Sequence, residues 1–120
     1  MTDLELLKLA AKAAGRKYLT RWSEKITDWD SPHHGGAALY PQGPGGQCQS
    51  WNPLTDDGDA LRLAVKLRID IDWQDTAVFP EPTVEAYRKS PADASFCASE
   101  PDEDYRRAIV RAAAAIGAKQ

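Results

Sequence analysis

The stretch WNPLTDDGDALRLAVKL, residues 51–67, gives the clearest fold signal in this chain of 120 residues. Its Asn-Pro pair is typical of a turn, and Asp56 or Asp57 is a favoured N-cap residue. Acidic side chains in a first turn also suit the positive end of the helix dipole. Apolar residues then recur at helical spacing, at Ala60, Leu61, Ala64, Val65 and Leu67. The stretch therefore predicts a turn followed by an amphipathic helix over 57–67.

Two further amphipathic helices are predicted near the two ends of the sequence. The first covers 3–14, because residues 2–5 have the form of a capping box and Gly15 suits the position after a helix. The last begins near 99–102, where a second Ser-x-x-Asp pattern occurs, and we expect Gly117 to stop it. Its apolar stripe contains Tyr105, Ile109, Ala112, Ala113 and Ile116.

The segments between these helices predict short β-strands. The strongest signal is IDIDW, residues 69–73, where apolar and acidic side chains alternate strictly. The other expected strands are 17–22, paired with 26–29, then a return to the sheet at 48–51, and finally 76–79 and 83–88. Loops are expected at 30–37, at 41–46 and at 90–98.

The order helix, strands, helix, strands, helix predicts an α+β fold in one domain spanning 1–120. Most connections between strands are too short for crossovers, so antiparallel pairing is expected. The predicted architecture is a small, mostly antiparallel sheet packed with three amphipathic helices, in an α-β-α sandwich-like arrangement.

Composition restricts the classes of function. The net charge of −3 and the pI of about 5.3 argue against non-specific binding to nucleic acid, which depends on a basic surface. No apolar run approaches the ~20 residues needed to cross a bilayer, and no signal-peptide pattern is present, so the expected location is the cytoplasm. Cys48 and Cys97 are expected to be free thiols there, with a disulfide between them as the alternative.

Three blocks resemble small bacteriophage and prophage proteins: DLELLKLAAKAAG at 3–15, the stretch at 51–67, and RRAIVRAAAAIG at 106–117. Together they look like the phage α-β-α sandwich group, which is related to the NinX-type proteins. This resemblance implies a compact α+β sandwich of viral origin and no established enzyme activity. Residues 23–50 and 74–98 match nothing in that group.

Several residue groups were weighed as chemical sites. The adjacent His33 and His34 could hold a metal together with Asp28, Asp30 or Cys48, but zinc-type ligand spacing is absent, and we expect a solvated loop. The run of acids at 56–59 lacks the calcium-loop pattern and is expected to cap a helix.

Two other patterns give still weaker support for a catalytic or phosphate-binding site. Asp70 and Asp72 share one strand face and are expected to be solvated rather than catalytic. The Gly-rich segment 43–46 lacks the Lys-Ser/Thr ending of a phosphate loop. We therefore expect no catalytic residues, no metal and no cofactor.

The aromatic residues give the best indication of binding. Trp51 and Trp73 are expected to fill the core. Trp22, Trp29 and Tyr40 lie near the Gly-rich loops together with His33 and His34, and these five are the candidate contacts with a partner or ligand. The motif residues are Trp51, Asn52, Pro53, Asp56 and Asp57.

The leading hypothesis is a non-enzymatic bacteriophage or prophage accessory protein. It would bind a host protein inside the bacterial cell and counter a defence system. The first alternative is a protein that binds or sequesters a nucleotide signal, with aromatic rings stacking on the base and Arg16, Lys17, Arg21 or Arg62 holding phosphate. Weaker alternatives are a metal-dependent hydrolase that uses His33 and His34, and a homodimer formed through the last helix.

Overall fold

In a computed structural model, which describes residues 1–74, 82–88 and 96–120, the chain forms helices and two antiparallel sheets. The α-helices are α1 (Asp3–Ala13), α2 (Asp57–Leu67) and α3 (Tyr105–Ala118). The first sheet pairs β1 (Arg21–Ser23) with β2 (Ala38–Tyr40), and the second contains β3 (Asp70–Gln74), β4 (Thr83–Arg88) and β5 (Phe96–Pro101) in that order. Two short 3₁₀ helices, η1 (Gly46–Gln49) and η2 (Asp102–Asp104), complete the described elements.

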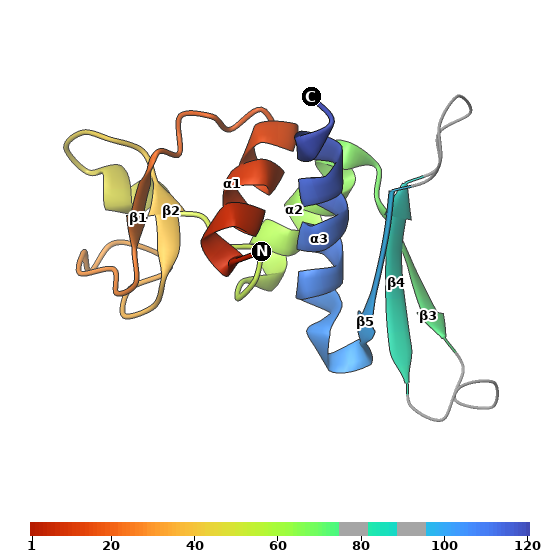
Figure 1. Cartoon of the computed structure of the whole chain (residues 1–120). Helices are drawn as coiled ribbons and strands as arrows, with labels where there is room; N and C mark the ends of the chain where they lie inside the picture. The colour runs from red at the N-terminus through yellow and green to blue at the C-terminus, as the bar shows by residue number, and fades with distance from the viewer. Residues whose placement is uncertain (75–81, 89–95) are drawn as a thin grey trace.

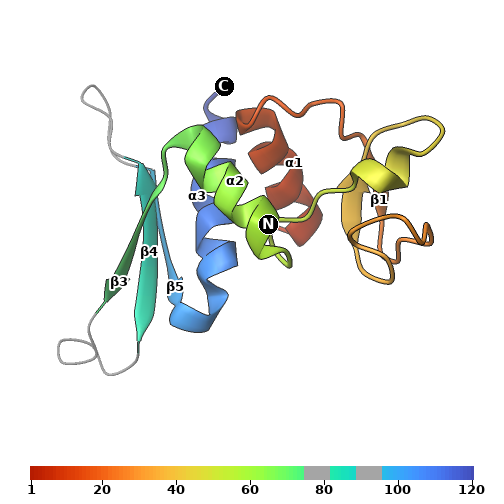
Figure 2. The ribbon, with the colours of Figure 1, turned by 180° about the vertical axis from the view of Figure 1, so that it is seen from behind.

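The three α-helices form a layer between the two sheets (Figures 1 and 2). Helix α3 lies against β4 and β5, and α1 packs along α3 on the side away from that sheet. The β1–β2 pair stands apart on the far side of α1. This is the α+β class with antiparallel strands and three helices that the sequence predicted, with the strands divided between two sheets. None of the helices in the described part of the chain has the length and apolar character needed to cross a membrane.

The first two helices begin and end close to where the sequence predicts. Thr2 caps α1 by accepting a hydrogen bond from the Glu5 amide, and Gly15 follows with a φ of +76° that favours glycine. Asp56, rather than Asp57, caps α2, and the predicted bounds 57–67 are confirmed.

Within α2 the expected apolar stripe is partly wrong. Ala60, Ala64 and Leu67 are buried as expected, and Leu63 joins them, whereas Leu61 and Val65 are 60% and 65% exposed. Leu61 and Val65 follow Ala60 and Ala64 by one residue, which turns them about 100° around the helix and away from the core.

The start and end of α3 differ from the prediction. Residues 96–101 form β5, so 96–98 are strand rather than loop, and Ser99 cannot cap a helix from within that strand. The helix starts at Tyr105 after η2. Gly117 does not stop it but lies inside it, where an added Cβ would sit 2.0 Å from the carbonyl oxygen of Leu9. This glycine therefore sets how closely α1 and α3 approach.

The core consists mainly of small and aliphatic residues between the helices and the second sheet. Its contributors are Leu6, Leu7, Ala10, Ala11, Leu63, Leu67, Val84, Ala86, Ala98, Ile109, Val110, Ala113 and Ile116. Trp51 is buried as predicted, but Trp73 is 57% exposed, and its ring lies 6.0 Å from that of Tyr105. Trp73 lies on β3, an edge strand of this sheet, whereas α3 packs on β4 and β5.

Residues 21–49, here called the small lobe, differ most from the prediction. The partner of β1 is β2 and not 26–29, and only the last part of the expected strand 17–22 is extended. Ile26 instead forms an isolated bridge with His34. Of residues 48–51, which were expected to return to the sheet, only Trp51 does so, through two backbone hydrogen bonds with Leu39.

In the second sheet, β3 and β4 follow the predicted strands 69–73 and 83–88, whereas β5 was not predicted. β3 pairs with β4 from Asp70↔Tyr87 to Gln74↔Thr83, and β4 pairs with β5. Asp70 and Asp72 point to the exposed face, as their alternation predicted. The expected strand 76–79 lies outside the described residues.

Candidate functional site

A pocket of about 590 Å³ lies between the end of α1, the turn that follows it, and α2. Its volume is within the range that holds small-molecule ligands. It is lined by Ala14, Gly15, Arg16, Tyr18, Trp51, Leu61, Arg62, Leu63, Val65 and Lys66.

Three cationic side chains line this pocket and no acidic residue does, although the whole chain has a net charge of −3. Arg62 forms an ion pair with Asp59, with 2.7 Å between Nη2 and Oδ1. No carboxylate partner is found for Arg16 or Lys66 in the described residues. The pocket is therefore electrostatically suited to an anion.

The aromatic and apolar part of the lining is held in place by Arg16. Its guanidinium lies 6.0 Å from the ring centroid of Trp51, and its Nη1 donates to the Tyr18 hydroxyl at 3.2 Å. The Trp51 ring is buried, whereas Tyr18 is half exposed and leaves ring surface open. Leu61 and Val65 add exposed aliphatic surface on the α2 side.

Two of the four basic residues that the sequence offered as phosphate ligands line this pocket. Arg16 and Arg62 were named as phosphate ligands, and both line it, whereas Lys17 and Arg21 do not. Lys66 was missed, although it follows Arg62 by four residues and so lies on the same helix face. Tyr18 was missed as well, because its position depends on the direction that the chain takes after the turn at Gly15.

A buried polar network joins the small lobe to the start of α2. His33 Nδ1 lies 2.7 Å from the Ser50 hydroxyl, and that hydroxyl lies 2.7 Å from the hydroxyl of Ser31. Ser31 also accepts the His33 backbone N–H at 3.1 Å. All three residues are buried, so the imidazole is fixed in one orientation.

The other imidazole nitrogen faces two carboxylates. His33 Nε2 lies 3.0 Å from Asp59 Oδ2 and 3.4 Å from Asp56 Oδ2. Asp59 accepts the Asn52 backbone N–H through the same Oδ2 at 2.9 Å. Although both carboxylates are near, Nε2 is a buried side-chain atom without a hydrogen-bond partner in the described structure.

Ser50, His33 and Asp59 are the residue types of a hydrolytic triad, but their surroundings do not suit that chemistry. Ser50 is buried, it also contacts Ser31, and it lines none of the four main pockets. A nucleophile needs an open site where substrate can reach it beside oxyanion-stabilising donors. The arrangement serves to position His33.

The predicted alternative in which His33 and His34 share a metal is wrong, because their side chains diverge. His34 Nδ1 contacts the Asp28 carbonyl oxygen, and its ring stacks on Trp29 with centroids 4.1 Å apart. Trp29 is 84% exposed, which makes this stack a candidate contact surface. Trp22 and Tyr40 are half-buried in the β1–β2 pair.

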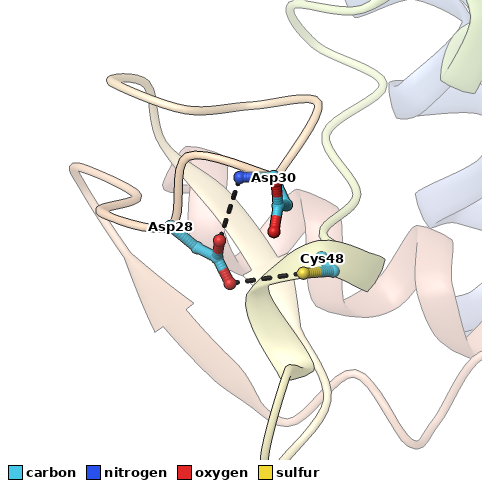
Figure 3. A group of neighbouring side chains, drawn as sticks. All are labelled: Asp28, Asp30 and Cys48. Atoms are coloured by element: carbon cyan, nitrogen blue, oxygen red, sulfur yellow. Dashed lines mark hydrogen bonds between the residues drawn. The ribbon is translucent and has the colours of Figure 1, made fainter.

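Asp28, Asp30 and Cys48 form a second cluster, on the small lobe (Figure 3). Asp28 accepts hydrogen bonds from the Asp30 backbone N–H at 2.9 Å and from the Cys48 thiol at 3.2 Å. The Asp30 amide and then the thiol lower the pKa of Asp28, and the hydrogen bond to Asp28 raises the pKa of Cys48. Cys48 is a free cysteine, and its raised pKa disfavours the thiolate, which is the nucleophilic and metal-binding form.

The motif residues mainly hold the lobe against the helices. Asn52 is buried, donates to the Ala37 carbonyl at 2.7 Å and accepts the Leu54 N–H at 3.0 Å. Pro53 is fully buried next to it. Asp57 accepts hydrogen bonds from Arg106 and from the Tyr105 hydroxyl, which ties α2 to α3.

Comparison of the chain with protein-family models, with curated proteins and with solved structures finds no match. The resemblance to the phage α-β-α sandwich group therefore stays a prediction. Function has to be argued from the geometry of the sites.

Proposed function

We propose that this chain is a binding protein for an anionic ligand that carries a flat ring, and that a nucleotide is the ligand class. The observation that carries the proposal is the convergence of Arg16, Arg62 and Lys66 on one pocket without an acidic lining residue. Guanidinium and ammonium groups are the side chains best suited to phosphate.

The ring part of the ligand follows from the rest of the lining. Tyr18 presents open ring surface, and Leu61 and Val65 offer an apolar wall on the opposite side. Any nucleobase can stack on an aromatic side chain, because every base has a π-face. A sugar phosphate without a base would leave that wall unused.

Calorimetry with adenosine monophosphate, adenosine and inorganic phosphate tests this proposal. We expect the nucleotide to bind more tightly than either part alone, because each part engages one side of the pocket. Arg16→Gln and Lys66→Gln should each weaken nucleotide binding roughly 10-fold or more, since a hydrogen bond to a charged group contributes about 1.5–3 kcal/mol.

The matched control is Lys25→Gln, which removes one positive charge from an exposed site on the small lobe. It should leave nucleotide affinity unchanged. If all three variants weakened binding equally, nucleotide affinity would depend only on the net charge of the protein and not on this pocket. An absence of nucleotide binding at millimolar concentration would contradict the proposal.

A protein partner is the second candidate function, and the exposed stack of Trp29 on His34 favours it. Large aromatic side chains at exposed positions are frequent anchors of protein contacts. In this version the protein is a phage accessory factor acting on a host protein in the bacterial cytoplasm. Capture from bacterial lysate that is lost in Trp29→Ala but kept in Lys25→Gln would support it, and capture unaffected by Trp29→Ala would argue against this surface.

A further inference from the structure

A second site lies where the small lobe meets the start of α2, at His33, Asp56 and Asp59. Asp56 and Asp59 belong to one turn, and both direct an Oδ2 atom toward the same imidazole nitrogen. The three candidate donor atoms lie within 4.8 Å of one another. Two carboxylates that close favour a positive charge between them.

The position of His33 indicates which positive charge suits the site. Its side chain is only 6% exposed, and Nε2 has no hydrogen-bond partner in the described structure. A cation placed between Nε2 and the two Oδ2 atoms would contact all three donor atoms at once.

The distances agree with coordination. Zinc–nitrogen and zinc–oxygen bonds of about 2.0–2.1 Å at tetrahedral angles place neighbouring ligand atoms roughly 3.3 Å apart. The observed separations from His33 Nε2 are 3.0 Å to Asp59 and 3.4 Å to Asp56.

The surroundings also match those of a metal-binding histidine. Such a histidine typically uses its second nitrogen to hydrogen-bond an orienting group, and here the Ser50 hydroxyl occupies that place at 2.7 Å. The outer carboxylate oxygens have partners of their own, since Asp56 Oδ1 accepts the Asp59 N–H and Asp59 Oδ1 accepts Arg62. The Asp56 side chain is 31% exposed, which leaves a route from solvent.

We propose that His33, Asp56 and Asp59 bind one divalent transition-metal ion of the zinc class, with water completing the coordination. One imidazole nitrogen and two carboxylate oxygens are a donor set that zinc accepts. The ion would connect the small lobe to α2, because His33 and the two aspartates come from these two parts of the chain.

The test is calorimetric titration of the full chain with Zn²⁺ after treatment with a chelator, with Mg²⁺ as a second probe. We expect one Zn²⁺ per chain, little affinity for Mg²⁺, and a higher melting temperature with Zn²⁺ bound. In ¹⁵N spectra the Nε2 resonance of His33 should shift on binding, which a site elsewhere would not cause.

Asp56→Asn is the informative variant, because asparagine is as good an N-cap as aspartate and the helix start is kept. It should weaken Zn²⁺ binding by more than about 100-fold, since even the loss of an outer-shell partner costs 10- to 100-fold. Asp28→Asn is the matched control, because it removes one carboxylate from the cluster that contains Cys48. Its Zn²⁺ affinity should be unchanged.

Two outcomes would overturn the proposal. The first is the absence of stoichiometric Zn²⁺ binding to the unsubstituted chain, which would leave a proton on His33 as the counter-charge. The second is binding that survives Asp56→Asn but is lost in Asp28→Asn, which would place the ion at Asp28, Asp30 and Cys48.

Discussion

Three aspartates in four residues have three different roles. Asp56 caps α2, Asp57 reaches across to α3, and Asp59 turns inward to the Asn52 amide and His33. The sequence predicted the first role, because acids before an apolar helical stripe are typical of capping. It could not predict the other two, because they depend on where α3 and the small lobe pack.

Asp57 offers a residue-scale prediction about pH. Its hydrogen bond from Tyr105 and then that from Arg106 lower its pKa below the ordinary value of 3.8. A carboxyl group with a lowered folded-state pKa stabilises the fold above its unfolded pKa and loses this contribution as the pH falls through the folded pKa. Asp57→Asn should therefore be less stable than the unsubstituted chain near neutral pH, and the two should converge in acid.

Urea unfolding at a series of pH values between about 2 and 7 measures this difference. The effect should be small, because the pair is exposed to solvent. The control is Asp70→Asn, an exposed strand residue for which we expect no comparable convergence. A stability difference between Asp57→Asn and the unsubstituted chain that stays constant down to the lowest pH would contradict the assignment.

The burial of individual tryptophans also depends on how distant elements pack, which the sequence pattern does not reveal. Trp51 was predicted to be buried and is, because the segment that carries it returns to β2. Trp73 was given the same role from its alternation in β3, yet it is exposed. Alternation identifies which face of a strand a residue occupies, but not whether the strand lies at the edge of its sheet, as β3 does.

At the scale of elements, the contact between α1 and α3 depends on small residues. Ala10 and Ala113 are fully buried, and Gly117 sits directly against the backbone at Leu9. Helix pairs that approach this closely have no room for an added methyl group. A close-packed interior cannot easily rearrange to make room for it.

Gly117→Ala should therefore destabilise the fold even though alanine favours helix formation by about 1 kcal/mol over glycine. We expect a net loss of about 1–2 kcal/mol in the free energy of unfolding, because the upper range of overpacking costs, about 2–3 kcal/mol, is offset by about 1 kcal/mol of helix preference. Chemical denaturation followed by circular dichroism measures it.

Gly58→Ala in α2 is the matched comparison. Its added Cβ would lie 3.2 Å from the Arg62 guanidinium and from Asp56 Oδ1, which are side-chain ends that can move. The free energy of unfolding should change by less than about 1 kcal/mol. If both substitutions had the same effect, the contact of Gly117 with Leu9 would not be the cause.

The elements also show where sequence patterns are sufficient. The bounds of α2 could be predicted because a cap, a first turn of acids and an apolar stripe all agree. The sequence did not predict β5. One reason is that its mostly small residues show no alternation of apolar and polar side chains that favours a strand. Its identity depends on pairing with β4, which is a tertiary effect.

At the scale of the whole molecule, the small lobe is joined to the helices mainly by polar contacts. Asn52 holds the Ala37 carbonyl and the Leu54 amide, and the network of His33 lies beside it. Of the buried aliphatic residues in the lobe, Leu39 belongs to the main apolar core, whereas Ile26 is buried outside it. The sequence predicted neither this separation nor the pocket, because both depend on how distant segments pack.

Asn52→Ala should loosen the lobe selectively. It removes the partner of the Ala37 carbonyl and of the Leu54 amide, which are partly buried. An unpaired group costs up to about 1–3 kcal/mol when it is fully buried. We expect the backbone amides of Ile26 and Leu39 to exchange with solvent deuterium faster. The exchange rates of amides in the middle of α1 and α3 should change only as much as the global free energy of unfolding changes. Hydrogen exchange measured by NMR distinguishes the two sets.

Thr55→Ala is the control here, since Thr55 is exposed and its hydroxyl contact with the Asn52 carbonyl is long, at 3.5 Å. It should leave exchange in the lobe unchanged. Uniform acceleration across lobe and helices in Asn52→Ala would show that the two parts unfold together.

The pairing of α1 with α3 brings together the first and last helices of the chain. A ribosome completes α1 long before it makes α3, so the apolar side of the early helix lacks its final cover throughout most of synthesis. A nascent chain that stops short of residue 105 therefore exposes Leu7 and Ala10, which makes truncated products natural targets for chaperones and proteases.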